Sequence, residues 1–236
     1  MRIRRVLARL FPNGVARLRA TRGYLQRLRH GDGNVAVFDR IATENYWQDS
    51  ESVSGGGSNL HQTAVLRREL PRVLERLGVR SLLDAPCGDF NWMRQTELPG
   101  VSYTGVDVVA PLIERAQDQF GGPDRQFLCR NIITDPLPRA DAIVCRDCLS
   151  HLSYAHVFAT LKTFRESGAT YLLATTYPTR TSNWDIVTGS WRPINLEKRP
   201  FNFPPPIDRI VEGSTEYDGE YSDKTLAVWR LDSLVL

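Results

Sequence analysis

Short apolar stretches alternate with segments of helical periodicity along the middle of this chain, and this alternation constrains the fold more than any other feature. Consecutive parallel strands need a long crossover, usually a helix, which packs on one face of the sheet. The alternation therefore predicts an α/β fold with a mostly parallel sheet and helices on both faces. Strands are expected at 79–85, 101–107, 125–132, 140–147 and 169–177. Helices are expected at 64–77 (divided or restarted at Pro71), 90–98, 111–120 and 155–167.

Two further strand-like stretches, 208–213 and 225–234, follow with no helix between them. They predict an antiparallel C-terminal hairpin at the sheet edge, which brings the sheet to seven strands. Ligands of open α/β sheets bind beyond the carboxyl ends of the strands. Polar residues at those ends are therefore the first candidates for a functional site.

Charge divides the 236 residues into a basic N-terminal arm, 1–33, and one domain, 34–236. Residues 1–30 hold nine arginines and no acid, whereas the whole chain carries a net charge of only +3, so the rest is acidic. An acidic body argues against a nucleic-acid partner. The arm is interpreted as a solvated extension; the alternative is a basic amphipathic helix that contacts a membrane surface.

The sequence predicts a cytoplasmic protein, with peripheral membrane attachment through the arm as the alternative. No apolar stretch approaches the roughly 18–20 residues that span a bilayer, and the N-terminus lacks the apolar region of a secretory signal. Four cysteines in a chain of this length do not indicate a disulfide framework. Cys145 and Cys148 have the C-x-x-C spacing, but too few further ligands accompany them for zinc, so no metal is expected.

The turn "DAPCGDF", 84–90, follows the first apolar strand and indicates a nucleoside site. Gly88 permits close approach of a ligand to the backbone. Asp107 ends the next strand, where a carboxylate can bind both ribose hydroxyls of an adenosine. The glycines of a pyrophosphate-binding loop are missing and Asp89 adds an acid, which suits a cofactor with an amino acid tail.

With those residues in place, the chain resembles the class I S-adenosylmethionine-dependent methyltransferases, whose first motif is usually D/E-x-G-x-G-x-G. Several segments together resemble an uncharacterised bacterial subgroup with a DxPCGDFxWM first motif. These are "YWQDSESVSGGGS", "DAPCGDFNWM", "CRDCLSHLS", "YLLATTYP" and "NLEKRPFNFPPP". The resemblance covers residue 37 to the C-terminus and implies a Rossmann-like fold with S-adenosylmethionine as cofactor.

The resemblance also implies roles for single residues. Asp84 and Asp89 would hold the methionine amino group, directly or through water, and Asp107 would bind the ribose. The turn is formed by Pro86, Cys87 and Gly88, and the adenine would be bordered by Asn131 and Ile132. An N-terminal cap (34–62) with a Ser/Gly loop would contribute Trp47, Ser54, Gly55 and Gly57. Arg146, which precedes the acceptor segment, is the last predicted cofactor-binding residue.

"CRDCLSHLS" follows the fourth strand, where the acceptor meets the methyl group in this fold. His151 is the candidate base, because a hydroxyl acceptor must lose its proton. Asp147 would orient His151 or act as the base itself. The aromatic and polar segment 178–206 is expected to form a lid over the acceptor. The simpler interpretation is that His151 only caps the helix after the strand and that Asp147 is a turn residue. The aromatic side chains of 178–206 would then only pack this segment onto the sheet.

The sequence therefore predicts O-methylation of a small hydroxylated molecule or a glycan. One alternative is a methyltransferase acting on RNA or protein. Another, from a different class, is a non-catalytic adenosyl-binding module.

Overall fold

The computed structural model describes residues 33–235, so the predicted arm lies outside the described residues apart from Gly33. The sheet is built from β1 (Ser81–Asp84), β2 (Ser102–Asp107), β3 (Arg125–Cys129), β4 (Ala142–Cys145), β5 (Tyr171–Thr176), β6 (Asp208–Val211) and β7 (Thr225–Arg230). The α-helices are α3 (Asn34–Thr43), α4 (Ala64–Arg76), α5 (Ala110–Phe120), α6 (Tyr154–Glu166) and α7 (Glu216–Gly219). Four 3₁₀ turns lie at Gly56–Ser58, Met93–Gln95, Leu149–His151 and Leu231–Ser233.

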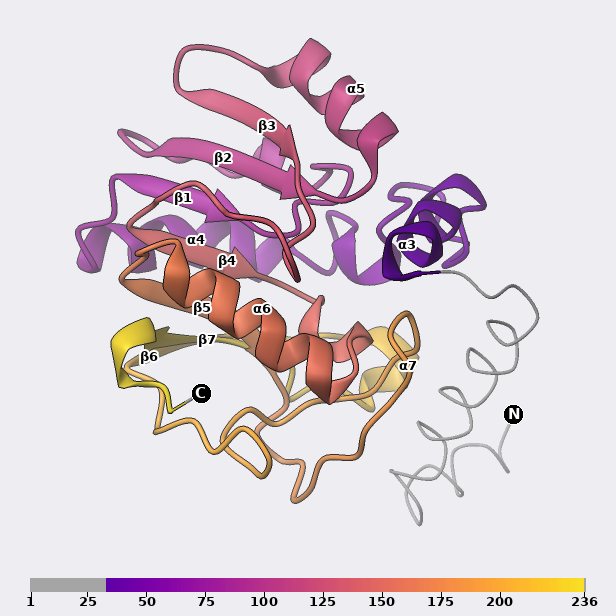
Figure 1. Cartoon of the computed structure of the whole chain (residues 1–236), viewed down its shortest axis with the longest axis vertical. Helices are drawn as coiled ribbons and strands as arrows, with labels where there is room; N and C mark the ends of the chain where they lie inside the picture. Colours follow the sequence, from indigo (N-terminus) through magenta and orange to yellow (C-terminus); the bar gives the residue numbers. More distant parts are fainter. Residues whose placement is uncertain (1–32, 236) are drawn as a thin grey trace.

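The seven strands form one sheet in the order β3-β2-β1-β4-β5-β7-β6 (Figure 1). The first five strands pair in parallel, while β7 runs antiparallel to both β5 and β6. The predicted mostly parallel sheet with an antiparallel C-terminal hairpin is confirmed. Strand order reverses between β1 and β4, which is the place where open α/β sheets bind ligands.

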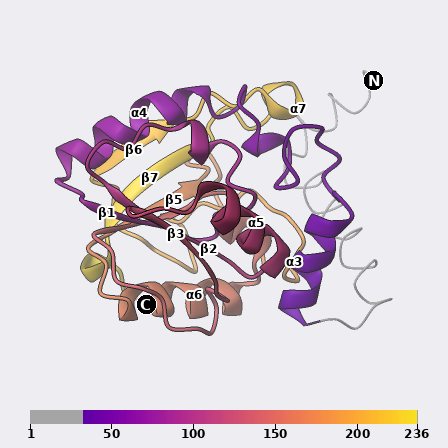
Figure 2. The same ribbon diagram turned by 90° about the horizontal axis from the view of Figure 1, so that it is seen from above.

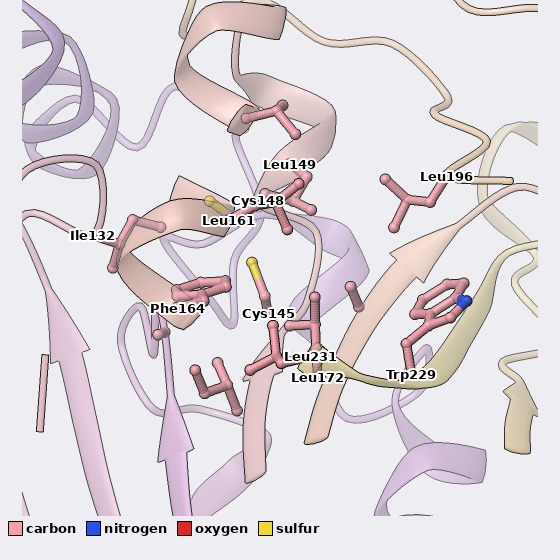
Figure 3. Packing of buried hydrophobic residues seen from close by; sticks show 14 of the residues in the cluster. Ile132, Cys145, Cys148, Leu149, Leu161, Phe164, Leu172, Leu196, Trp229 and Leu231 are labelled. Carbon is pink, nitrogen blue, oxygen red and sulfur yellow. The ribbon is translucent and has the colours of Figure 1, made fainter. Parts of the chain in front are cut away.

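Two hydrophobic clusters cover the two faces of the sheet, and α4 and α6 lie on opposite sides of it (Figure 2). Neighbouring residues of a strand contribute to different clusters, as Leu82 and Leu83 do in β1, because successive side chains point to opposite faces. Cys145 and Cys148 are buried in the cluster that includes α6 (Figure 3).

Three local predictions need correction. The helix around Pro71 is continuous, since α4 buries Leu66 and Leu70 before the proline and Val73 and Leu74 after it. That burial offsets the lost backbone hydrogen bond, which costs about 3 kcal/mol.

The helix expected at 90–98 is wrong, because only Met93–Gln95 forms a 3₁₀ turn and Phe90 has a left-handed φ of 59°. The helix α3 is missing from the sequence prediction. Its signal was the helical spacing of Val37, Phe38 and Ile41 in a segment that is otherwise polar.

The carboxyl edge of the parallel strands is crowded by segments from both ends of the chain. α3 and α7 lie beyond this edge (Figure 1). The antiparallel pairing places Thr225 opposite Thr176 and Val211 opposite Thr225, so the connection between β6 and β7 also reaches it. Within residues 33–235, the helices are too short or too polar to cross a membrane.

Candidate active site

A cavity of about 550 Å³ opens at the carboxyl edge of the sheet. All fifteen residues that the sequence predicted as cofactor-binding or catalytic line it. They are Trp47, Ser54, Gly55, Gly57, Asp84, Pro86, Cys87, Gly88, Asp89, Asp107, Asn131, Ile132, Arg146, Asp147 and His151. Residues as far apart in the sequence as Trp47 and His151 thus meet in one site, while the individual roles remain predictions.

Two buried carboxylates, those of Asp84 and Asp107, stand at the ends of β1 and β2. The Tyr103 hydroxyl donates to Asp84 Oδ2 over 2.7 Å. Burial, with a contribution from the Asp107 charge, raises the pKa of Asp84 to about 7. Asp107 accepts from the N–H groups of Gly88 and Val109, each over 3.0 Å, and burial raises its pKa as well. Neither carboxylate forms an ion pair with a basic side chain of the described chain, so a ligand that brings an ammonium group and hydroxyls would compensate both.

Asp89 lines the cavity, as predicted, and is also bonded to the Ser/Gly loop. Its carboxylate accepts hydrogen bonds from Ser52 Oγ (2.9 Å), the Val53 N–H (3.0 Å) and Ser54 Oγ (3.2 Å). The Asp89 N–H in turn donates to Ser54 Oγ over 3.1 Å. In this structure, Asp89 therefore fastens the Ser/Gly loop to the turn after β1.

Gly88 is required by this docked loop. Its φ is +56°, and a Cβ at this position would lie 2.3 Å from Ser54 Oγ. Ser54 therefore occupies the space where a side chain at position 88 would lie. Gly88 also lines the ligand cavity.

Gly88→Ala should destabilise the protein and release the segment 52–58, because the new methyl group displaces Ser54. Gly168→Ala is the matched control: Gly168 also has a left-handed φ (+76°), but its Cβ would meet nothing within 4 Å. Strain alone predicts a loss of about 1 kcal/mol in both variants. Urea unfolding and limited proteolysis measure the difference; equal losses in both variants, with an intact loop, would contradict the clash.

The far end of the loop is held by Arg146. The Arg146 guanidinium donates from Nη2 to the Gly57 carbonyl over 2.7 Å. A Cβ on Gly57 would lie 3.1 Å from both Asp147 Oδ2 and Lys224 Nζ. Trp47 packs beside Gly55, and its ring centroid is 5.1 Å from that of His151. The loop therefore spans the cavity from Asp89 to a charged cluster at the ends of β4 and β6.

That charged cluster contains two cations and three carboxylates. Arg146 Nη2 lies 2.7 Å from Glu212 Oε2, and Lys224 Nζ lies 2.5 Å from Asp147 Oδ2 and 3.4 Å from Glu216 Oε2. Burial alone would raise the pKa of Asp147, but the charges of Lys224 and Arg146 lower it to about 2. Asp147 is thus an ionised partner of Lys224 and is poorly suited to accept a proton. Arg146, predicted to bind the cofactor, contacts Glu212 and the loop.

His151 is oriented by a backbone carbonyl. Its Nδ1 lies 2.8 Å from the Ser190 carbonyl, which can only accept, so Nδ1 carries the proton and Nε2 keeps its lone pair. The hydrogen bond at Nδ1 thus goes to Ser190, while the Asp147 charge acts on the ring only electrostatically, and the role of Asp147 stays a prediction. Burial lowers the pKa of His151 to about 4, which keeps the imidazole neutral at pH 7.

Asn131 and Ile132 border the cavity just beyond β3. The Asn131 side-chain oxygen accepts from the Ile133 N–H over 3.0 Å, and the Ile132 carbonyl accepts from the Thr163 hydroxyl. Both residues are therefore fixed by local bonds at the position where the resemblance places the adenine.

The segment 178–206 contributes less to the cavity than its aromatic content suggested. Gly189, Ser190 and Trp191 line the cavity, whereas Phe201 and Phe203 are buried in the core. Its role as an acceptor lid remains a prediction.

Several cavity residues escaped the sequence analysis: Tyr177, Glu216, Tyr217, Tyr221 and Lys224. The available signal was the antiparallel hairpin, because reversing the chain beside β5 brings the acidic connection between β6 and β7 to the ligand edge.

A seven-stranded sheet of this topology with one ligand cavity at its carboxyl edge defines a Rossmann-like α/β protein. Two solved structures share the fold. Human N-acetylserotonin methyltransferase in complex with S-adenosylmethionine (SAM) has a TM-score of 0.56 and 13% identity, covering 92% of this chain and 67% of that one. The N-methyltransferase NodS of Bradyrhizobium japonicum with S-adenosylhomocysteine (SAH) has a TM-score of 0.54 and 16% identity, covering 84% and 98%.

The chain belongs to the methyltransferase-domain family, whose model matches residues 59–206. Uncharacterized methyltransferases of Mycobacterium tuberculosis and Mycobacterium bovis are 33% identical to it over 97 residues. That match covers 40% of this chain and 47% of the relatives, so the chain spans about half the length of the curated relatives it matches.

Proposed function

We propose that the chain is a SAM-dependent methyltransferase that methylates a hydroxyl group of a small molecule or glycan. The observation that carries the proposal is one cavity with two chemically different ends. One end holds the buried carboxylates of Asp84 and Asp107, and the other holds a neutral His151.

The residues at the first end fit the cofactor. Asp84 would receive the ammonium group of the methionine part, since it lacks a basic partner in the described chain. Asp107 would accept from the ribose hydroxyls with the lone pairs that Gly88 and Val109 leave free. Asn131 and Ile132 would flank the adenine. Bound there, SAM would supply a methyl group on a positively charged sulfur, leaving as the neutral thioether SAH.

His151 supports oxygen as the methylated atom. An alcohol or phenol that gains a methyl group on oxygen must lose its proton, and Nε2 of a neutral imidazole can take it. The bond from Nδ1 to the Ser190 carbonyl fixes the tautomer that leaves Nε2 available. Enclosure by Trp47 and Trp191 supports exclusion of water from the transfer.

Binding of SAH tests the cofactor end directly. Isothermal titration should show one SAH per chain, and Asp107→Asn should weaken it about ten- to hundredfold, because a charged hydrogen-bond acceptor becomes neutral. Asp118→Ala, on the exposed face of α5, is the control and should keep the wild-type affinity. Absence of SAH binding by the wild type would refute the proposed function, and an unchanged affinity in Asp107→Asn would refute the role of Asp107.

Transfer of a labelled methyl group tests the acceptor. Panels of phenolic diols, methyl glycosides and primary amines can be incubated with the full chain and methyl-labelled SAM. A methyl ether among the products supports the proposal, while products methylated only on nitrogen would contradict it.

A further inference from the structure

Tyr177 is a cavity residue held in one orientation by its neighbours. It follows β5 directly, and its side chain is only 2% exposed although it lines the cavity. Its ring meets Trp191 edge-on at 6.2 Å and Tyr221 at 5.8 Å between centroids. Its N–H donates to the Ile194 carbonyl over 2.8 Å, and its carbonyl accepts from the Arg180 N–H over 3.1 Å. Ring and backbone are therefore fixed.

The Tyr177 hydroxyl, in contrast, has no hydrogen-bond partner within residues 33–235. The charged groups that face it are Asp147, Glu212, Glu216 and Arg146. Burial, reinforced by the three carboxylates, raises the pKa of Tyr177, so the hydroxyl stays protonated. The Tyr177 hydroxyl oxygen is not fully buried and keeps contact with the cavity, so a polar atom of a bound molecule can accept a hydrogen bond from it.

The surroundings of Tyr177 indicate what kind of molecule brings that atom. Trp191, Tyr217 and Tyr221 form an aromatic wall on its side of the cavity, with Tyr221 contacting the other two at 4.9 and 5.6 Å. Tyr46 and Trp47 line the cavity from the N-terminal segment. Aromatic side chains favour an acceptor with a flat ring. If His151 acts as the proposed base, that ring carries a hydroxyl group.

We propose, resting on the proposed function, that Tyr177 sets acceptor specificity by donating a hydrogen bond to a second oxygen of a ring-bearing acceptor. The reacting hydroxyl of the same acceptor faces His151, and the ring lies against the aromatic wall. The acceptor class is thus a hydroxylated ring compound with at least two oxygen functions.

Four simple probes test this contact in the full chain saturated with SAH. Phenol carries one oxygen, while catechol, resorcinol and hydroquinone carry two at increasing spacing. Dissociation constants can be measured by NMR titration. At least one diol should bind about three- to tenfold more tightly than phenol, which is the effect of one added hydrogen bond. Tyr177→Phe should remove this preference while SAH affinity and melting temperature stay unchanged.

Tyr171→Phe is the matched control, because Tyr171 lies at the other end of β5 and does not line the cavity; it should keep the diol preference. The inference is overturned if no diol binds more tightly than phenol, if the preference survives in Tyr177→Phe, or if that variant loses stability, which would reveal a structural partner for the hydroxyl. Failure of SAH to bind would refute the proposed function instead, so the two failures are distinguishable.

Discussion

Replacing His151 by alanine should lower turnover about 10²- to 10⁴-fold, which is the range of general-base contributions. SAH affinity should stay nearly unchanged, because Asp84 and Asp107, which would hold the cofactor, are hydrogen-bonded to Tyr103, Gly88 and Val109 and not to His151. The measurement is the initial rate of methyl transfer together with calorimetric SAH binding. Equal rates in the variant and the wild type would remove His151 as the base.

The pH profile adds a second readout for His151. The pKa of His151 is lowered to about 4, so Nε2 keeps its lone pair at all higher pH values. With SAM saturating, so that its ammonium group would keep Asp84 ionised, the rate should therefore be flat between about pH 5.5 and 8 and fall only as the pH approaches 4. An unperturbed histidine would instead halve the rate near pH 6.5. His156→Ala is the control: His156 contacts the Thr188 hydroxyl and does not line the cavity, so the rate should persist.

Glu212→Ala should cost about 3–5 kcal/mol of unfolding free energy, the usual loss when a buried ion pair is broken from one side. The Glu212 side chain is 1% exposed and that of Arg146 is 3% exposed, with 2.7 Å between their charged atoms. Without Glu212, the two cations Arg146 and Lys224 keep only the carboxylates of Asp147 and the more distant Glu216. Arg146 also loses the partner that holds its guanidinium in place to donate to the Gly57 carbonyl. Denaturant unfolding measures the loss.

A double variant separates lost charge pairing from lost packing. Arg146→Met combined with Glu212→Leu replaces the pair by apolar side chains and should recover much of the stability, although it removes the bond to the loop. Glu166→Gln disrupts only the exposed pair with Lys162 and should change stability far less. If Glu212→Ala unfolds at the same denaturant concentration as Glu166→Gln, the cluster does not stabilise the fold.

The sheet and the location of the cavity were predictable because both follow from local patterns. Apolar strands that alternate with helical segments are compatible with only a few sheet topologies. In a parallel sheet, the residues that end the strands, here Asp84, Asp107 and Asp147, lie at one edge regardless of the loop conformations. The antiparallel hairpin followed from the lack of a crossover-length helical pattern between 213 and 225, where the chain forms only the four-residue α7. These features depend on periodicity, which a single sequence displays.

The bonding inside the site was not predictable, because it depends on which polar groups meet across long sequence separations. Nothing in the sequence indicated that Asp89 would accept hydrogen bonds from Ser52 and Ser54, about 35 residues earlier. The sequence also did not indicate that Lys224, 77 residues later, would donate to the Asp147 carboxylate. The residue type indicates that a buried carboxylate will have hydrogen-bond partners, but only the folded structure shows which residues those partners are.

The Ser/Gly loop is bonded to Asp89 at one end and to Arg146 at the other, and its residues line both halves of the cavity. Both attachments are present without a ligand, so the part of the cavity wall that the loop provides is formed before a ligand enters. Ordering a chain rich in glycine costs conformational entropy. Here the glycine run at 55–57 is ordered on folding, so a ligand that binds against the loop does not bear that cost.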